Sequence, residues 1–199
     1  MKLFLIRHGQ TNWRKIGFLS YTDLELTKKG ISQAKKIARK LKKEKIDKIY
    51  SSPLKRCSRT AQIIGKCLDL KIHIVPQLRE VNFGILERLS LKEAEKKYPE
   101  LFLARQKDKW NFRIPSGESY KDAAKRVLNF LKKLSDMKHQ NIVLVTHVTI
   151  IKILLKYFSN LSMEKIDQTR FPPTSLTIFE KKNKRFRVLA INDISHLNL

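Results

Sequence analysis

The 199-residue chain is short of cysteine, short of acidic residues and without a long apolar run. No stretch approaches the ~20 consecutive apolar residues that a membrane-spanning helix requires. The apolar run from Leu3 to Ile6 is too short for the core of a signal peptide, and no small-residue cleavage site follows it. These absences favour a cytoplasmic protein that has no membrane partner.

Only two cysteines occur, Cys57 and Cys67, and both fall within one predicted helix. Ten residues at ~1.5 Å of rise each separate them by ~15 Å, whereas a disulfide requires Cα atoms within ~7 Å of each other. A bridge between them is therefore not expected. Reduced thiols agree with a cytoplasmic location.

Acidic residues are scarce: 18 Asp and Glu stand against 43 Lys and Arg, which gives a formal net charge of +25. This excess is compatible with nucleic-acid binding, with attraction of small phosphorylated substrates, or with a lysine-rich composition alone. Many of the lysines lie on predicted helix faces, where a solvated surface is the usual explanation. Because no aromatic interleaving or zinc-ligand spacing accompanies them, we expect no specific nucleic-acid partner.

Strand-like and helix-like segments alternate through most of the chain, which predicts an α/β protein. The content of 42% apolar residues suffices for one domain over residues 1–199. Between Pro76 and Gly117 the periodicity is broken, which predicts two short helices in an excursion over the sheet edge, a candidate lid. The predicted strands are Lys2–Arg7, Lys48–Ser51, Ile72–Val75 and Asn141–Thr146, followed by a hairpin of Ser175–Glu180 and Arg185–Ile191.

Charged side chains and histidines follow four of the predicted parallel strands. Arg7 and His8 end the first strand, Arg56 follows the second, Glu80 follows the third, and His147 ends the fourth. Each residue alone is more often structural or solvated. Because sites in open α/β sheets form beyond the carboxyl ends of the strands, their arrival at one edge predicts a shared site.

This set of residue types suits phosphoryl transfer. A neutral imidazole can attack phosphorus, and arginine pairs bidentately with phosphate oxygens. A glutamic acid can protonate the leaving oxygen and afterwards activate water. Its proximity to anionic oxygens would raise its pKa and keep it protonated.

Six motifs in order resemble the histidine phosphatase superfamily, the phosphoglycerate-mutase-like proteins, over essentially the whole chain. They are Arg7-His8-Gly9-Gln10-Thr11-Asn12-Trp13; Asp23 with Leu26-Thr27, Gly30 and Gln33-Ala34; Tyr50-Ser51-Ser52-Pro53-Leu54-Lys55-Arg56 with Thr60-Ala61; Leu78-Arg79-Glu80-Val81-Asn82-Phe83-Gly84; Gly117-Glu118-Ser119; and Val145-Thr146-His147. The resemblance implies a three-layer α/β/α sandwich with a mainly parallel central sheet.

The same resemblance implies roles for the site residues. His8 becomes the phosphorylated nucleophile and Glu80 the proton donor, while Arg7, Arg56 and His147 bind the phosphoryl group. The substrate would also meet the loop of Gly9, Gln10 and Thr11, with Arg14 and Val148 nearby. The family requires no metal or other cofactor, and the chain has no metal-ligand spacing.

Three positions depart from the family pattern. Arg14 stands where asparagine is usual, Val148 replaces the glycine after the second histidine, and Arg88 replaces the glycine that commonly follows Glu87. Arg14 could supply another phosphate donor or point to solvent. Val148 keeps its backbone N–H, but its branched side chain could narrow the pocket. None of the three removes a catalytic group.

The expected activity is metal-independent hydrolysis of phosphomonoesters on small metabolites through a phosphohistidine intermediate. Mutase-type phosphoryl transfer is the alternative. The mutases that this chain resembles carry a longer insertion and a Glu-Arg-His-Tyr-Gly block, whereas this chain is short and has Glu80-Val81-Asn82-Phe83-Gly84 at that place. A non-catalytic polyanion-binding protein is the second alternative. A homodimer is compatible with the sequence, which does not name the substrate.

Overall fold

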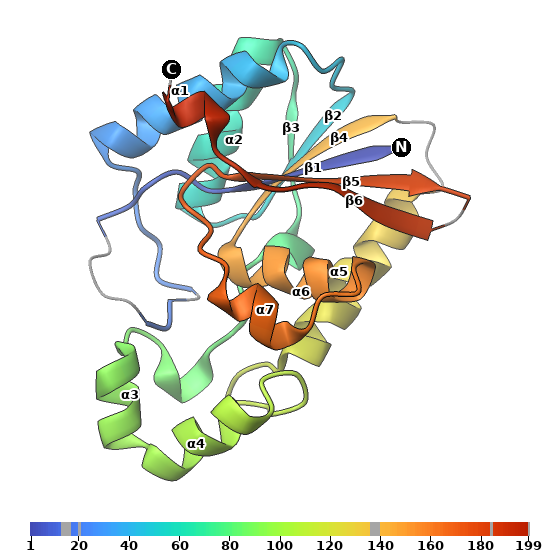
Figure 1. Ribbon diagram of the computed structural model, residues 1–199. Coiled ribbons are helices and arrows are strands. Elements are labelled where there is room, and N and C mark those ends of the chain that lie inside the picture. The colour runs from blue at the N-terminus through green and yellow to red at the C-terminus, as the bar shows by residue number, and fades with distance from the viewer. Residues whose placement is uncertain (13–16, 20, 136–139, 184, 199) are drawn as a thin grey trace.

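The computed structural model describes residues 1–12, 17–19, 21–135, 140–183 and 185–198. Its centre is a six-stranded sheet in the order β3-β2-β4-β1-β5-β6 (Figure 1). The first four strands of that order pair in parallel, and β5 and β6 form an antiparallel hairpin against β1. The strands are β1 Lys2–Arg7, β2 Lys48–Ser51, β3 Ile72–Ile74, β4 Asn141–Thr146, β5 Leu176–Lys182 and β6 Arg185–Asp193.

Helices cover both faces of this sheet. The helices α1 (Lys28–Leu41) and α2 (Lys55–Leu68) lie on one face, and α5 (Tyr120–Ser135) and α6 (Val148–Phe158) lie on the other (Figure 1). Successive side chains of β1 point to opposite faces of the sheet and contribute to two separate hydrophobic cores, one under each helical layer. Leu3 and Leu5 pack with residues of α5 and α6, whereas Phe4 and Ile6 pack with residues of α1 and α2. The predicted three-layer α/β/α fold with a mainly parallel sheet is therefore confirmed.

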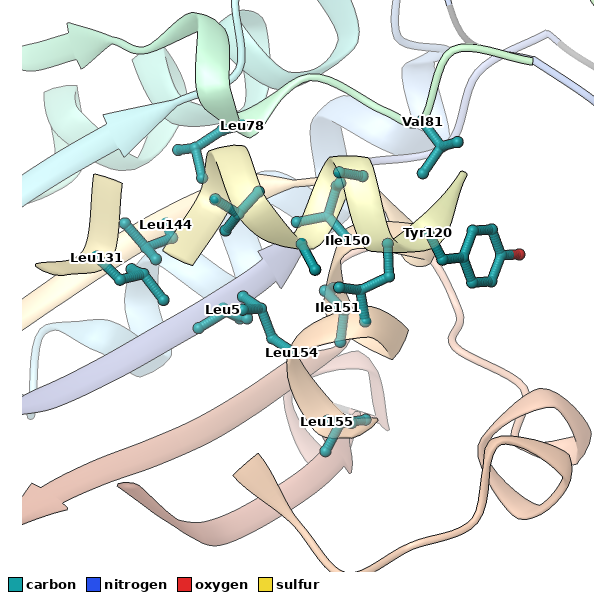
Figure 2. Close-up of a cluster of buried hydrophobic side chains, with 14 of the residues drawn as sticks. Leu5, Leu78, Val81, Tyr120, Leu131, Leu144, Ile150, Ile151, Leu154 and Leu155 are labelled. Atoms are coloured by element: carbon teal, nitrogen blue, oxygen red, sulfur yellow. The ribbon is translucent and has the colours of Figure 1, made fainter. Parts of the chain in front are cut away.

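The core on the α5–α6 face is the larger of the two. Figure 2 shows Leu5 of β1 and Leu144 of β4 facing Leu131 of α5 and Leu154 of α6. All four side chains are at most 3% exposed. Because burial of one such aliphatic side chain stabilises a fold by ~1.5–3 kcal/mol, this contact fixes both helices on the sheet that carries the site.

The chain between β3 and α5 leaves the sheet. It begins with a short 3₁₀ helix at Pro76–Leu78, has another at Gly84–Leu86, and continues into α3 (Leu91–Lys97) and α4 (Pro99–Lys107). Figure 1 shows α3 and α4 beyond the edge of the layered body, below the ends of the strands. Ser90 and Glu93 form a reciprocal capping box that starts α3, which explains why so short a helix forms here.

The element boundaries differ from the sequence predictions in a few places. The strand β3 ends one residue early, at Ile74, because it is an edge strand with mostly exposed side chains. An unpredicted helix, α7 (Met163–Gln168), is six residues long and buries only Ile166, so it leaves almost no periodic signal.

Both cysteines are free and lie on α2, in agreement with the sequence prediction. Across the described ranges, no helix combines the length and apolar character needed to cross a membrane.

Candidate active site

A cavity of about 710 Å³ opens at the carboxyl ends of β1 and β4. Its described lining residues come from the β1 loop, the start of α2, the segment after β3, the start of α6 and the segment after α7. They are Arg7, His8, Thr11, Gly17, Leu19, Arg56, Glu80, Phe83, Val148, Thr149, Asp167, Gln168, Thr169 and Arg170. Four of the five residues predicted to be catalytic thus line one cavity, and the fifth, His147, lies directly behind it.

His8 is held directly after β1 with its imidazole neutral. Its backbone N–H donates to the Thr146 carbonyl at 3.1 Å, and its Nδ1–H donates to its neighbour's carbonyl, Gly9 O, at 2.8 Å. Because Nδ1 carries the proton, the lone pair is on Nε2. Burial, reinforced by the charges of Arg7 and Arg56, lowers the pKa of His8 well below its usual value. The ring is therefore in the form that can act as a nucleophile.

His147 packs against His8, with ring centroids 5.4 Å apart. Arg56 Nε donates to His147 Nδ1 at 3.3 Å, so Nε2 carries the proton and donates to Ser52 Oγ at 2.9 Å. Burial and then the charge of Arg56 lower the pKa of this imidazole well below its usual value. His147 is 1% exposed. Because Arg56 donates to its ring, the start of α2 fixes the position of the second histidine as well as supplying the arginine.

Two arginines with little access to water supply positive charge to the cavity. The Arg56 side chain is 1% exposed, and its NH1 donates to the Thr22 carbonyl at 2.8 Å. Arg7 NH1 donates to the Phe171 carbonyl, while its buried Nε has no partner within the described part of the chain. Buried donors without a partner cost free energy, which an anion in the cavity would recover.

Glu80 is 4% exposed and points its carboxyl group into the same cavity. Burial raises its pKa, although hydrogen bonds from the backbone N–H groups of Val81, at 2.9 Å, and Thr149, at 3.4 Å, act in the opposite direction, as does Arg56. The net shift favours the protonated acid. A carboxyl group in that state can donate a proton to a leaving oxygen.

The predicted substrate-binding residues divide into three groups. Thr11 and Val148 line the cavity, and Val148 is the first residue of α6. Gly9 and Gln10 are not among the described lining residues. The Gly9 N–H donates to Thr60 Oγ1 at 3.0 Å, and Gln10 Oε1 accepts from Thr27 Oγ1 at 3.0 Å, so both are committed to supporting the loop. Arg14 lies outside the described residues.

Arg88, the third departure from the family pattern, adopts φ 68°, in the left-handed region. Glycine enters this region without strain, whereas an arginine there costs ~1–3 kcal/mol. The Arg88 N–H donates to the Phe18 carbonyl at 2.8 Å, which holds the residue in that conformation. The loop therefore keeps the shape that glycine would give it.

A support for the acid was not predicted from the sequence. Arg126 of α5 pairs bidentately with Glu118, at 2.9 Å and 3.0 Å, and also donates to the carbonyls of Glu80, at 3.0 Å, and Gln77. Glu118 in turn accepts from the Asn82 N–H at 3.0 Å. These bonds tie the segment that carries Glu80 to α5. Glu118 belongs to one of the quoted motifs, but Arg126 had no distinguishing signal.

The chain belongs to the histidine phosphatase superfamily (branch 1), whose family model matches residues 3–194. It is 28% identical to phosphoserine phosphatase 1 of Hydrogenobacter thermophilus, over 99% of this chain and 94% of that one. It is 29% identical to the metal-independent phosphoserine phosphatase of Arabidopsis thaliana, over 99% and 83%. The crystal structure of the alpha-ribazole phosphatase from Shigella flexneri superposes with a TM-score of 0.84 at 27% identity, covering 97% and 96%.

Within the ranges that the structure describes, no three or more His, Cys, Asp or Glu side chains are grouped so that they could hold a metal ion. The ionisable groups among the described cavity residues include arginines, an acid whose pKa burial raises, and a carboxylate already paired with two lysines.

Proposed function

We propose that the protein hydrolyses phosphomonoesters of small molecules through a phosphohistidine at His8. The observation that carries the proposal is the juxtaposition of a neutral imidazole, a carboxyl group of raised pKa and two arginines in one cavity. The family and the named phosphatases among its relatives support the same reaction.

The reaction has two displacement steps. In the first, His8 Nε2 attacks phosphorus, the P–O bond to the alcohol breaks, and Glu80 gives its proton to the leaving oxygen. In the second, Glu80 as a carboxylate accepts a proton from water while the water oxygen attacks phosphorus and the P–N bond breaks. Inorganic phosphate leaves, and Glu80 is again protonated.

Arg7 and Arg56 stabilise the charge of the transferring phosphoryl group, with His147 behind them. Such groups act by positioning and electrostatics, since the loose transition state spreads charge over the phosphoryl oxygens. The guanidinium groups of buried Arg56 and part-buried Arg7 supply the stabilisation for which other phosphoryl-transfer enzymes use Mg²⁺. We infer from this that catalysis needs no metal, as the name of the Arabidopsis relative also suggests.

The decisive experiment is to trap the intermediate. The enzyme would be mixed with a substrate labelled in its phosphate and quenched rapidly without acid. We expect label on His8 that survives alkali and is lost in acid. The variant His8→Ala should carry no label and should lose at least ~10³-fold in kcat. His73→Ala, which removes an exposed histidine on β3, is the matched control and should keep both label and turnover.

Three results would contradict the proposal. Label that persists in His8→Ala would move the nucleophile elsewhere. Inactivation by a strong chelator with recovery on adding a divalent ion would contradict metal independence. Phosphate that passes to a second alcohol in preference to water would indicate a mutase and not a phosphatase.

A further inference from the structure

The segment that follows α7 brings a third arginine to the active-site cavity. Arg170 lines the cavity together with Arg7 and Arg56, although it lies far from both in the sequence. Burial is the main cause of a lowered pKa at Arg7, and the positive charge of Arg170, across the same cavity, also lowers it. No motif of the sequence marked this residue.

The backbone around Arg170 is fixed on both sides. Its own carbonyl accepts a hydrogen bond from Asn192 Nδ2 at 2.6 Å, and the carbonyl of the next residue, Phe171, accepts from Arg7 NH1. Phe171 itself is 2% exposed. The side chain of Arg170 therefore starts from a rigid position at the cavity wall. Arg170 as a whole residue is exposed, and it forms no ion pair with any described carboxylate.

Neither of the two acidic side chains among the described lining residues forms an ion pair with Arg170. Glu80 has a raised pKa and favours its neutral form. Asp167, the other carboxyl group in the lining, accepts from Lys109 Nζ at 2.7 Å and from Lys152 Nζ at 3.1 Å. The described lining thus has three guanidinium groups, one acid whose pKa is raised, and one carboxylate that is already paired with two lysines.

We propose that Arg170 binds a second anionic group of the substrate, a carboxylate or a second phosphate, while Arg7 and Arg56 hold the phosphoryl group that reacts. This inference rests on the proposed phosphatase function and specifies its substrate class. A substrate with an ammonium group beside its carboxylate, such as phosphoserine, is disfavoured because Asp167 is already paired with two lysines. The preferred class is therefore a phosphorylated hydroxy acid or a bisphosphate.

Three esters with the same carbon skeleton test this inference. Glycerol 3-phosphate has a hydroxymethyl group where 3-phosphoglycerate has a carboxylate, and phosphoserine has an ammonium group in addition to the carboxylate. We expect kcat/KM for 3-phosphoglycerate to exceed that for each of the other two by ~10-fold or more. Glycerol 3-phosphate lacks the carboxylate that forms a charge-assisted hydrogen bond with Arg170, and the ammonium group of phosphoserine is repelled by the arginines of the cavity. Fructose 1,6-bisphosphate against fructose 6-phosphate tests a second phosphate in the same way.

The variant Arg170→Ala should lower kcat/KM for 3-phosphoglycerate by ~10-fold or more, mainly through KM, and for glycerol 3-phosphate far less. Arg170→Lys should restore part of the preference, because it returns the charge without the planar fork. Lys165→Ala removes an exposed charge from α7 that does not line the cavity, and should change neither value.

Equal losses on all substrates in Arg170→Ala would overturn the inference, as would wild-type turnover of phosphoserine that matches 3-phosphoglycerate. Calorimetric binding of 3-phosphoglycerate and glycerol 3-phosphate to His8→Ala, with and without Arg170→Ala, gives a readout independent of turnover. If the wild type does not hydrolyse p-nitrophenyl phosphate, the proposed function fails. The ratio of the affinities for 3-phosphoglycerate and glycerol 3-phosphate, with and without Arg170→Ala, then decides by itself for or against the role of Arg170.

Discussion

Replacement of Arg126 by methionine is the sharpest test of how this fold holds its acid in place. The Arg126 and Glu118 side chains are 21% and 22% exposed, so most of the ion pair is removed from water. Arg126 also donates to the carbonyls of Gln77 and Glu80. Arg126→Met leaves the carboxylate of Glu118 and both carbonyls without their cationic donor.

The magnitude follows from these contacts. Hydrogen bonds to charged groups contribute ~1.5–3 kcal/mol each, and leaving a partly buried charge unpaired adds to the loss. We expect Arg126→Met to lower the free energy of unfolding by about 2–4 kcal/mol. For a chain of this length, that corresponds to a fall in Tm of roughly 5–15 °C. Glu80 should also lose its alignment, and kcat for an alkyl phosphate should fall by ~10–100-fold.

A matched pair of variants makes the result interpretable. Arg113 pairs with Asp122 at 2.8 Å, but its side chain is 67% exposed, so Arg113→Met should cost less than ~1 kcal/mol. Thermal unfolding and alkyl phosphate kinetics would be measured for both. If the two variants lose the same stability and Arg126→Met keeps full turnover, then α5 does not position the acid and the argument is refuted.

Two further predictions follow from the buried titratable groups. Glu80→Gln should slow alkyl phosphates by ~10²–10⁴-fold and p-nitrophenyl phosphate much less, because its good leaving group needs little protonation; equal losses would make Glu80 structural. Burial lowers the pKa of His196 to about 4, so the unfolded chain binds more protons between that value and ~6.5. Stability should therefore decrease as the pH is lowered from ~6.5 to ~4, and should decrease less in His196→Asn, as Tm measured against pH would show.

The sequence predicted the parallel part of the fold because its signals are local. The run Asn141–Thr146 is apolar throughout, and in the structure it is the central strand β4, buried between two helical layers. The expectation that His8, Arg56, Glu80 and His147 would meet needed only one further rule, that parallel strands end at the same edge. Each of these residues lies within a few positions of a strand or of a helix that follows one.

Contacts between distant segments could not be predicted in this way. Gln10 stands in the nucleophile loop, but its amide oxygen accepts from Thr27 because Gly30 of α1 approaches the loop closely; a Cβ at Gly30 would lie 2.2 Å from Gln10 O. Arg170 follows a helix of six residues that buries one side chain. Nothing in its local sequence separates it from the 43 Lys and Arg of the chain, and only the folded chain places it beside Arg7.

Burial in this cavity affects His8 and Glu80 in opposite directions on the pKa scale, yet it favours the neutral form of each. Attack requires a neutral imidazole and departure of the alcohol requires a protonated acid, so one physical cause prepares both groups. The charge of Arg56 reinforces the effect on His8 but opposes it on Glu80. A bound phosphoryl dianion offsets the arginine charge, so the substrate itself favours protonation of the acid that its hydrolysis requires.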